Sequence, residues 1–384
     1  MAQRLILNET SYHGAGAVKE IVPEVKRRGL KKALIVTDQD LMKFGVVKQV
    51  TDILDAAELP YSIYDEVVAN PTVAVVKKGV DVFQASGADY LIAVGGGSPM
   101  DAAKAVGIIV TNPEFADVVS LEGVTPSKNP SVPLIAIATT AGTASETTIY
   151  YVITDEAKCR KYVCVDPHDI PIVAIVDPEI MSGMPPGLTA ATGMDALTHC
   201  IEAYVTRAAW EMSDFISLKA IEMISNSLRN TMKNDPDARR EMALAQYMAG
   251  MAFSNVGLGL VHSMAHPLSA HYDTPHGVAN AVLLPYVMEF NAPAAATKYR
   301  DVARAMGVTG TEKMSDAEGA RAAIDAVRKL SKDLDIPQTL GEIGVQEKDL
   351  KTLAASAIVD ICTGGNPRDC TVEEVLGVYR TALG

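Results

Sequence analysis

The sequence predicts two domains, an α/β domain over residues 1–184 and an all-α domain over residues 185–384. In the first half, short apolar runs alternate with amphipathic helical patterns, which is typical of a mostly parallel sheet with helices on both faces. After Met184-Pro185-Pro186-Gly187 the strand patterns stop, and Ala, Met and Leu recur at helical spacing between caps and Pro/Gly breaks. A chain of 384 residues is long enough for two such domains.

The elements of the first half follow from the period of the apolar residues. The predicted strands are Leu5–Leu7, Ala33–Val36, Tyr61–Tyr64, Leu91–Val94, Leu134–Ala138 and Ile172–Val176. Amphipathic helices are predicted at Ala17–Arg28, Val73–Gln84 and Met100–Ile109. Tyr150–Ile153 and Tyr162–Val165 flank the polar segment Thr154–Lys161, which predicts a hairpin.

The composition excludes several classes of function. The net charge is −13 with scattered Lys and Arg, which argues against nucleic acid or an anionic membrane as a partner. Five cysteines without a CxxC pair suit free thiols in a reducing cytoplasm, and the N-terminus has no signal-peptide pattern. The uncharged stretch Met242–Val261 has about the length of a membrane span, but its polar residues and glycines favour a buried helix.

A glycine-rich turn joins the predicted strand Leu91–Val94 to the helix that follows it. The turn reads GGGSP at 95–99, and it predicts Ser98 as the helix N-cap, Pro99 as the first helical residue and Asp101 as a capping-box acid. Glycines at a helix N-terminus let backbone amides approach an anion, and a pyrophosphate suits such a site. The alternative is a tight turn without a ligand, and no GxGxxG motif is present to decide between them.

Two further segments favour a nucleotide. The polar turn TTAGTASE at 139–146 follows another predicted strand and offers hydroxyls and backbone amides. Asp38 follows the segment ALIVT, where a carboxylate can accept hydrogen bonds from both ribose hydroxyls and repel a 2′-phosphate. Asp38 therefore predicts NAD rather than NADP, and its other interpretation is a cap of the next helix.

Five of the seven histidines lie in one window that begins at Asp195; they are His199, His262, His266, His271 and His276. Asp195 and His199 are four residues apart, as are His262 and His266, so each pair shares one helix face. Imidazoles with a carboxylate and no thiolate are typical of an Fe²⁺ or Zn²⁺ site. One carboxylate and three imidazoles leave room for a substrate, but the spacing leaves open which histidines bind. Glu202 either orients a ligand or faces solvent.

Together these segments resemble the iron-containing (group III) alcohol dehydrogenases over essentially the full chain. The matching segments are GGGSP at 95–99, TTAGTASE at 139–146, ATGMDALTHCIE at 191–202, GLGLVHSMAHPL at 257–268, TPHG at 274–277 and CTGGNPR at 362–368. The last segment, with the opening RLILNET, is similar to the subgroup that interconverts lactaldehyde and 1,2-propanediol.

The resemblance implies a dehydroquinate synthase-like fold, with an NAD-binding α/β domain, a helical metal-binding and catalytic domain, and an active site in the cleft between them. It implies Fe²⁺, alternatively Zn²⁺, held by Asp195, His199, His262 and His276. His266 is implied as a proton relay or cofactor contact, so His266 and His276 are the predicted catalytic residues. The positions implied for NAD(H) are Asp38, Asn70, Gly97, Ser98, Thr139, Thr140, Thr143, Val152 and Lys161.

The implied reaction is metal-assisted hydride transfer between NAD(H) and lactaldehyde or 1,2-propanediol, and the alternative is a broader short-chain primary alcohol or diol dehydrogenase. A cytoplasmic homodimer, with the N-terminal strand in its interface, is implied as well. A lyase like dehydroquinate synthase is disfavoured by the segments at 257–277 and by the few Lys and Arg residues. A vestigial site would require a broken ligand set.

The resemblance also bears on the residues around the site. Phe253 and Cys362 are predicted to line the substrate pocket. Tyr150 stands where a smaller polar residue is expected, and His271 has no assigned role.

Overall fold

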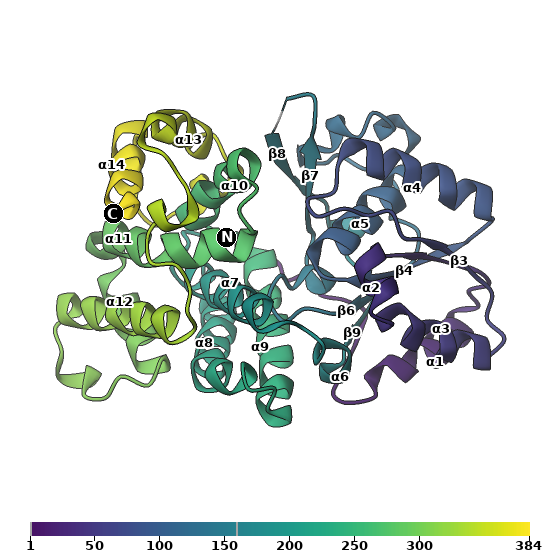
Figure 1. Ribbon diagram of the computed structural model, residues 1–384, viewed down its shortest axis with the longest axis horizontal. Helices are drawn as coiled ribbons and strands as arrows, with labels where there is room; N and C mark the ends of the chain where they lie inside the picture. Colours follow the sequence, from purple (N-terminus) through teal and green to yellow (C-terminus); the bar gives the residue numbers. More distant parts are fainter. Residues whose placement is uncertain (1, 159) are drawn as a thin grey trace. The chain divides into compact units, whose positions relative to one another are not determined.

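The computed structural model describes residues 2–158 and 160–384. They divide into two compact units, Met1–Gly183 and Met184–Gly384 (Figure 1). Cys159, one of the five cysteines, lies outside the described residues, while Cys164, Cys200, Cys362 and Cys370 are free thiols.

Unit 1 is built on a six-stranded parallel sheet with the order β1-β9-β6-β4-β2-β3. Its strands are β1 (Thr10–His13), β2 (Ala33–Val36), β3 (Tyr61–Tyr64), β4 (Tyr90–Gly95), β6 (Leu134–Ala138) and β9 (Val173–Val176). A smaller sheet contains β5 (Gly123–Val124), β7 (Tyr150–Asp155) and β8 (Arg160–Val165), with β7 and β8 paired antiparallel. The predicted hairpin is therefore confirmed, with longer strands and a shorter turn.

Helices cover both faces of the six-stranded sheet, as predicted (Figure 1). The helices of this unit are α1 (Ile21–Arg28), α2 (Gln39–Lys43), α3 (Val46–Ala56), α4 (Val73–Ser86), α5 (Gly97–Thr111) and α6 (Pro178–Met181). Helices α1 and α3 bury Ile21, Val50 and Leu54 against strand residues such as Ile35, Ile92 and Ile137. Helices α4 and α5 pack together, and α4 contacts β2 and β3. Because helices cover both faces, the inner strands β2, β6 and β9 are continuous apolar runs that are fully buried.

The predicted strand Leu5–Leu7 is wrong. The first strand is instead β1, which pairs with β9 at Thr10↔Val173, and residues 5–7 do not form a strand. That segment is fixed by a side chain, since Asn8 donates to the carbonyl oxygens of Glu146 and Pro171 at 2.9 and 2.7 Å. An apolar run alone does not make a strand, and Ile6 instead packs against the buried cluster of Ile149, Val163 and Val165.

Unit 2 consists of helices. They are α7 (Pro186–Val205), α8 (Glu211–Thr231), α9 (Pro236–Val256), α10 (Leu260–Tyr272), α11 (His276–Ala305), α12 (Asp316–Asp333), α13 (Leu350–Ile358) and α14 (Val372–Leu383) (Figure 1). Helix α7 is central, since it packs against α8, α9 and α11 and every residue from Thr189 to Val205 is buried. A helix that is buried on all sides has no polar face for solvent, so its polar residues must find partners inside the protein.

The uncharged stretch Met242–Val261 is not one helix. Helix α9 ends at Val256, Gly257 adopts a φ of 79°, and α10 begins at Leu260. None of the helices that the structure describes combines the length and apolar character that a membrane crossing requires. Most of the stretch is buried, but it is broken at the glycines just before the histidine-bearing helix starts.

Candidate metal centre

Three helices of unit 2 contribute the polar residues of the predicted site. Helix α7 carries Asp195, His199 and Glu202, and all three are buried. Helix α10 carries His262 and His266, one turn apart, and α11 begins at His276 directly after Pro275. The spacing of four residues in α7 and α10 therefore places the side chains in successive turns of one face, as the sequence predicts.

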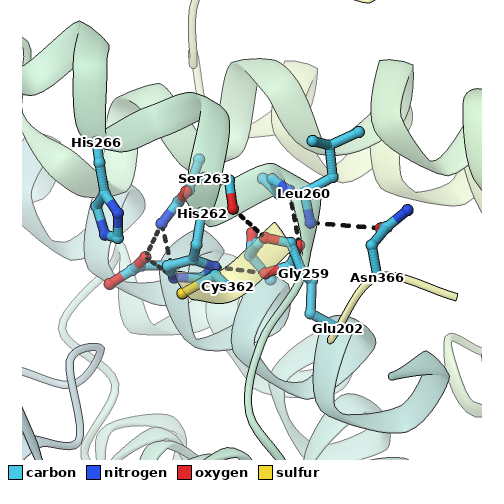
Figure 2. Close-up of polar contacts among 12 residues, drawn as sticks. Glu202, Gly259, Leu260, His262, Ser263, His266, Cys362 and Asn366 are labelled. Carbon is cyan, nitrogen blue, oxygen red and sulfur yellow. Dashed lines mark hydrogen bonds and ion pairs between the residues drawn. The ribbon is translucent and has the colours of Figure 1, made fainter. Parts of the chain in front are cut away.

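The first turn of α10 is held by a distant segment. Asn366 lies in the segment CTGGNPR, and its Oδ1 accepts from the backbone nitrogen of Leu260 at 3.3 Å (Figure 2). Asn366 and Asn291 of α11 exchange two further hydrogen bonds, each 2.8 Å long. The C-terminal segment thereby fixes where α10 begins and so where His262 lies.

The start of α11 lies directly against α7. A Cβ atom on Gly277 would overlap the backbone oxygen of Ala191, so only glycine allows this approach. We expect Gly277→Ala to move His276 away from Asp195 and to lower the free energy of unfolding by about 1–3 kcal/mol, with weaker metal binding. Thermal unfolding and metal titration measure both effects. Gly187→Ala is the control, because a Cβ there meets nothing within 4 Å, and equal behaviour of the two variants would contradict the prediction.

Asp195, His262 and His276 point their ligand atoms at one position. Each offers one atom, and these atoms all lie within 4.8 Å of one another. Oδ1 of Asp195 is 4.0 Å from Nε2 of His262 and 3.9 Å from Nε2 of His276. One carboxylate and two imidazoles grouped in this way form the donor set expected for Fe²⁺ or Zn²⁺.

Asn280, one turn after His276 on α11, shows that this group of atoms fits a cation. Its Nδ2 is 2.7 Å from Oδ1 of Asp195 and 3.1 Å from Nε2 of both His262 and His276. An amide nitrogen has only two hydrogens, so it cannot donate to three acceptors at once. Among the described residues, the buried Oδ1 of Asn280 has no hydrogen-bond partner. A divalent ion could bind the Asp195 oxygen and the two imidazole nitrogens at once, which the amide cannot do.

The charge states of the donors suit a metal. Burial would raise the pKa of Asp195, but His199, His276 and His262 and the hydrogen bond from Asn280 lower it below the usual value, so the carboxylate is ionised. Burial and the neighbouring His199 lower the pKa of His262 well below its usual value. A neutral imidazole and an ionised carboxylate are the forms that bind metals.

Glu202 orients His262 and does not face solvent. It is buried, and its Oε2 lies 2.5 Å from Nδ1 of His262, while its Oε1 accepts from the backbone nitrogen of Val261 at 2.7 Å (Figure 2). A carboxylate on Nδ1 keeps the hydrogen on that nitrogen and leaves the lone pair of Nε2 for a metal. Of the two alternatives for Glu202, this contact favours the one in which Glu202 orients a ligand.

The other three histidines of the window lie outside the three-residue donor set. The His199 ring stacks between Phe253 and His262, with ring centroids 4.3 and 4.7 Å away. Its buried Nδ1 has no hydrogen-bond partner in the part of the chain that the structure describes. His266 contacts Asp360 through Nδ1 at 2.8 Å and stacks on His276. His271 is exposed near the end of α10.

The residues predicted to bind a nucleotide lie in unit 1, where the sheet order changes direction. The chain passes from β2 to its neighbour β3 and then crosses back to β4 on the other side of β2. The direction of the strand order therefore reverses between β2 and β4, which is the switch point of the sheet. Asp38 follows β2, Gly97 and Ser98 follow β4, and Thr139 follows the adjacent β6. Ligands of open parallel sheets bind at the carboxyl ends of the strands beside such a point.

Several of these residues contact one another. Asn70 donates through its backbone nitrogen to Ser98 Oγ at 3.3 Å, and Lys161 Nζ donates to Asn70 Oδ1 at 2.6 Å. Cβ atoms built on Gly96 and Gly97 would meet the side chains of Thr140 and Thr143 at 3.0 and 3.4 Å. Asp38 caps α2 by accepting from the backbone nitrogen of Leu41 at 2.8 Å.

The predicted capping of α5 is wrong. The helix begins at Gly97 with Gly96 as its N-cap, so Ser98 and Pro99 lie inside the first turn. Asp101 does not form a capping box, because its carboxylate accepts from Ser145 Oγ at 2.8 Å and from the backbone nitrogen of Val152 at 3.1 Å. Asp101 therefore holds the polar turn and β7 against α5.

Each half of the chain matches a family of known proteins. The family described as "Iron-containing alcohol dehydrogenase" matches residues 8–178, and "Fe-containing alcohol dehydrogenase family, C-terminal" matches residues 189–383. The chain belongs to the iron-containing alcohol dehydrogenases. The lactaldehyde reductase of Escherichia coli (strain K12) is 61% identical to this family member over 382 residues, which is 100% of each chain. The NAD-dependent methanol dehydrogenase of Bacillus methanolicus is 42% identical over 372 residues, covering 96% of this chain and 97% of that protein. A solved structure of 1,3-propanediol oxidoreductase matches with a TM-score of 0.96 at 40% identity over 100% of both chains.

Two residues of this iron-containing alcohol dehydrogenase that contact the site were not among those predicted from the sequence. Asn280 lies four residues after His276 in a helical pattern, so its place on the same helix face was a usable signal. Asp360 meets His266 across 94 residues of chain, and no spacing rule connects two such distant positions.

Proposed function

We propose that this iron-containing alcohol dehydrogenase interconverts lactaldehyde and 1,2-propanediol with NAD(H) and Fe²⁺. The substrate assignment is supported by the 61% identity to the lactaldehyde reductase of Escherichia coli along the whole chain. The convergence of Asp195, His262 and His276 supports the metal. Zn²⁺ suits the same donors, so the identity of the metal rests on the family.

The donor set and its neighbours suggest a division of roles. Bound there, Fe²⁺ would act as a Lewis acid toward the substrate oxygen. Asp195, His262 and His276 would hold it, with His199 as the fourth ligand from the adjacent stacked ring. Glu202 keeps His262 in the tautomer that binding requires. His266 is proposed to accept the proton that the alcohol releases in oxidation. Phe253 and Cys362, which are both buried, are proposed to line the substrate pocket.

Unit 1 is proposed to bind NAD(H) through the nine positions named above, at the switch point between β2 and β4. The first turn of α5 presents backbone amides of Gly97 and Ser98, and a helix N-terminus attracts the negative charge of a pyrophosphate. Asp38 is proposed to face the adenosine ribose as well as to cap α2.

Replacing Asp38 tests its role in cofactor choice. We expect Asp38→Gly to raise the ratio of kcat/KM for NADPH over NADH on the order of tenfold or more, because a carboxylate close to a 2′-phosphate costs more than ~1.4 kcal/mol. Steady-state kinetics with both cofactors measures the ratio. Asp38→Asn keeps a capping oxygen without the charge and should shift the ratio in the same direction. If neither variant changes the ratio, Asp38 is only a helix cap.

The proposed reaction is tested with the full chain, purified anaerobically and loaded with Fe²⁺. NADH oxidation is followed with lactaldehyde, and NAD⁺ reduction with 1,2-propanediol, 1,3-propanediol, methanol and ethanol. We expect lactaldehyde and 1,2-propanediol to give the highest kcat/KM. A higher value for methanol or 1,3-propanediol would contradict the substrate assignment and favour the broader activity, and absence of net NADH consumption with every substrate would reject the enzyme class.

The homodimer and the cytoplasmic location are also proposals. Strand β1 is an edge of the six-stranded sheet, and the segment before it exposes Leu5 and Leu7 at 39% and 37%. An edge strand beside exposed leucines suits pairing with a second copy. Light scattering should give the mass of two chains, and the mass of one chain would contradict the dimer.

A further inference from the structure

Asp360 is a carboxylate whose two oxygens have different partners. It lies just before the short helix η9 (Ile361–Gly365). Its Oδ1 accepts from the backbone nitrogen of Cys362 at 2.9 Å and from the hydroxyl of Ser263 at 3.4 Å. Its Oδ2 lies 2.8 Å from Nδ1 of His266. One oxygen therefore fixes the carboxylate to the protein, and the other is directed at the histidine.

This contact determines which nitrogen of His266 carries the hydrogen. Burial would raise the pKa of Asp360, but His266 and the hydrogen bonds from His266 and Cys362 lower it below the usual range, so the carboxylate is ionised and only accepts. A neutral imidazole has one N–H, which must then be on Nδ1. Nε2 keeps its lone pair, and no described residue forms a hydrogen bond to it.

The His266 ring lies beside the metal donor set. It stacks on His276 with a centroid distance of 5.5 Å and an interplanar angle of 13°, and it meets His262 edge-on at 6.2 Å. His262 and His266 project from the same helix in Figure 2. Each has its own carboxylate on Nδ1, Glu202 for His262 and Asp360 for His266. The two pairs differ in that only His262 belongs to the grouped ligand atoms.

We propose that Asp360 is the positioning residue of His266, which it holds in the Nδ1–H tautomer so that Nε2 is a free acceptor beside the metal donors. This inference rests on the proposed function, in which His266 receives the hydroxyl proton during alcohol oxidation. In that step the substrate O–H bond breaks and an Nε2–H bond forms on His266. The carbon that carries this oxygen loses a hydride to NAD⁺ and becomes the carbonyl carbon. With the hydrogen already on Nε2, the proton would have no acceptor.

Asp360→Asn separates this role from a structural one. The backbone N–H of Cys362 can only donate and lies 2.9 Å from Oδ1, so the asparagine oxygen takes the Oδ1 position. The Ser263 hydroxyl can also donate to the carbonyl oxygen of Gly259 at 3.3 Å. The NH₂ group then faces Nδ1 of His266 and can only donate. His266 must become an acceptor at Nδ1, which moves its own hydrogen to Nε2. The variant keeps the size and the cap of η9 and reverses the tautomer.

The experiment uses the full chain labelled with ¹⁵N-histidine and loaded with Zn²⁺, which is diamagnetic. Two-bond ¹⁵N–¹H spectra report the tautomer of each of the seven histidines, and His266→Gln assigns the signal. We expect Nδ1–H in the wild type and Nε2–H in Asp360→Asn. With Fe²⁺ bound, kcat for lactaldehyde should fall by roughly 10²–10⁴-fold, with unchanged metal content and a smaller change in KM.

Asp369→Asn is the control, because it removes the same charge from a side chain that is 94% exposed and paired with Arg207. It should change neither the tautomer nor kcat. The inference is overturned if wild-type His266 carries its hydrogen on Nε2, a test that needs no variant, or if Asp360→Asn keeps the wild-type tautomer. If the wild type does not turn over lactaldehyde, the proposed function fails, while the spectra still decide the role of Asp360.

Discussion

Replacing His262 with alanine should abolish stoichiometric metal binding and NADH-dependent lactaldehyde reduction together. The variant removes one of the three grouped ligand atoms, and it also leaves the buried Oε2 of Glu202 without the imidazole at 2.5 Å. The loss of metal affinity should exceed the roughly 10–100-fold that the loss of an outer hydrogen-bond partner costs. An unpartnered buried group should also lower the free energy of unfolding by about 1–3 kcal/mol. Elemental analysis, an activity assay and circular dichroism melting measure the three effects.

His271→Ala is the matched control for this result. His271 lies on the same helix and is exposed, so the same substitution there should leave metal content and activity unchanged. A folded His262→Ala protein with one metal per chain and wild-type kcat would remove His262 from the ligand set.

Glu202→Ala should lower metal affinity by roughly 10–100-fold while all proposed ligands remain. Without the carboxylate, Nδ1 of His262 and the backbone nitrogen of Val261 both lose their acceptor, and the imidazole is free to rotate or change tautomer. Competition with a chelator measures the affinity. The effect should appear as faster metal loss, because the donors are present but no longer held in one arrangement.

Two further variants sharpen this expectation. Glu202→Gln offers one acceptor oxygen and should give an intermediate affinity. Glu222→Ala, at a half-exposed position on α8, should have no effect. Equal metal affinity in Glu202→Ala and the wild type would show that the position of His262 is set by the helix alone.

Most of the sheet was predictable because most of its strands are short apolar runs between turn residues. The predictions Ala33–Val36, Tyr61–Tyr64 and Leu134–Ala138 are confirmed to the residue. Leu5–Leu7 has the same local pattern but does not form a strand, because strand formation depends on tertiary context as well as on the local apolar pattern. The start of α5 was misplaced because glycine caps a helix through its backbone conformation, which side-chain capping rules do not detect.

The site was predictable where its residues are close in the sequence. The i, i+4 and i+7 spacing places Asp195, His199 and Glu202 on one helix face, but it does not tell which of them groups with the other helices. The pairs Glu202–His262 and Asp360–His266 span 60 and 94 residues, so they depend on how helices pack. The resemblance supplied the assignment of His262 and His276, and only the structure showed that Glu202 orients His262 and that Asp360 contacts His266.

The most direct test of the central claim is an anomalous difference map at the iron edge, from crystals of the Fe²⁺-loaded protein. We expect one peak per chain within bonding distance of Oδ1 of Asp195 and Nε2 of His262 and His276, with His199 turned onto it and the Asn280 amide withdrawn. His266 should lie outside bonding distance and keep its contact with Asp360. A peak elsewhere, or an active crystal without a peak between these three residues, would contradict the account.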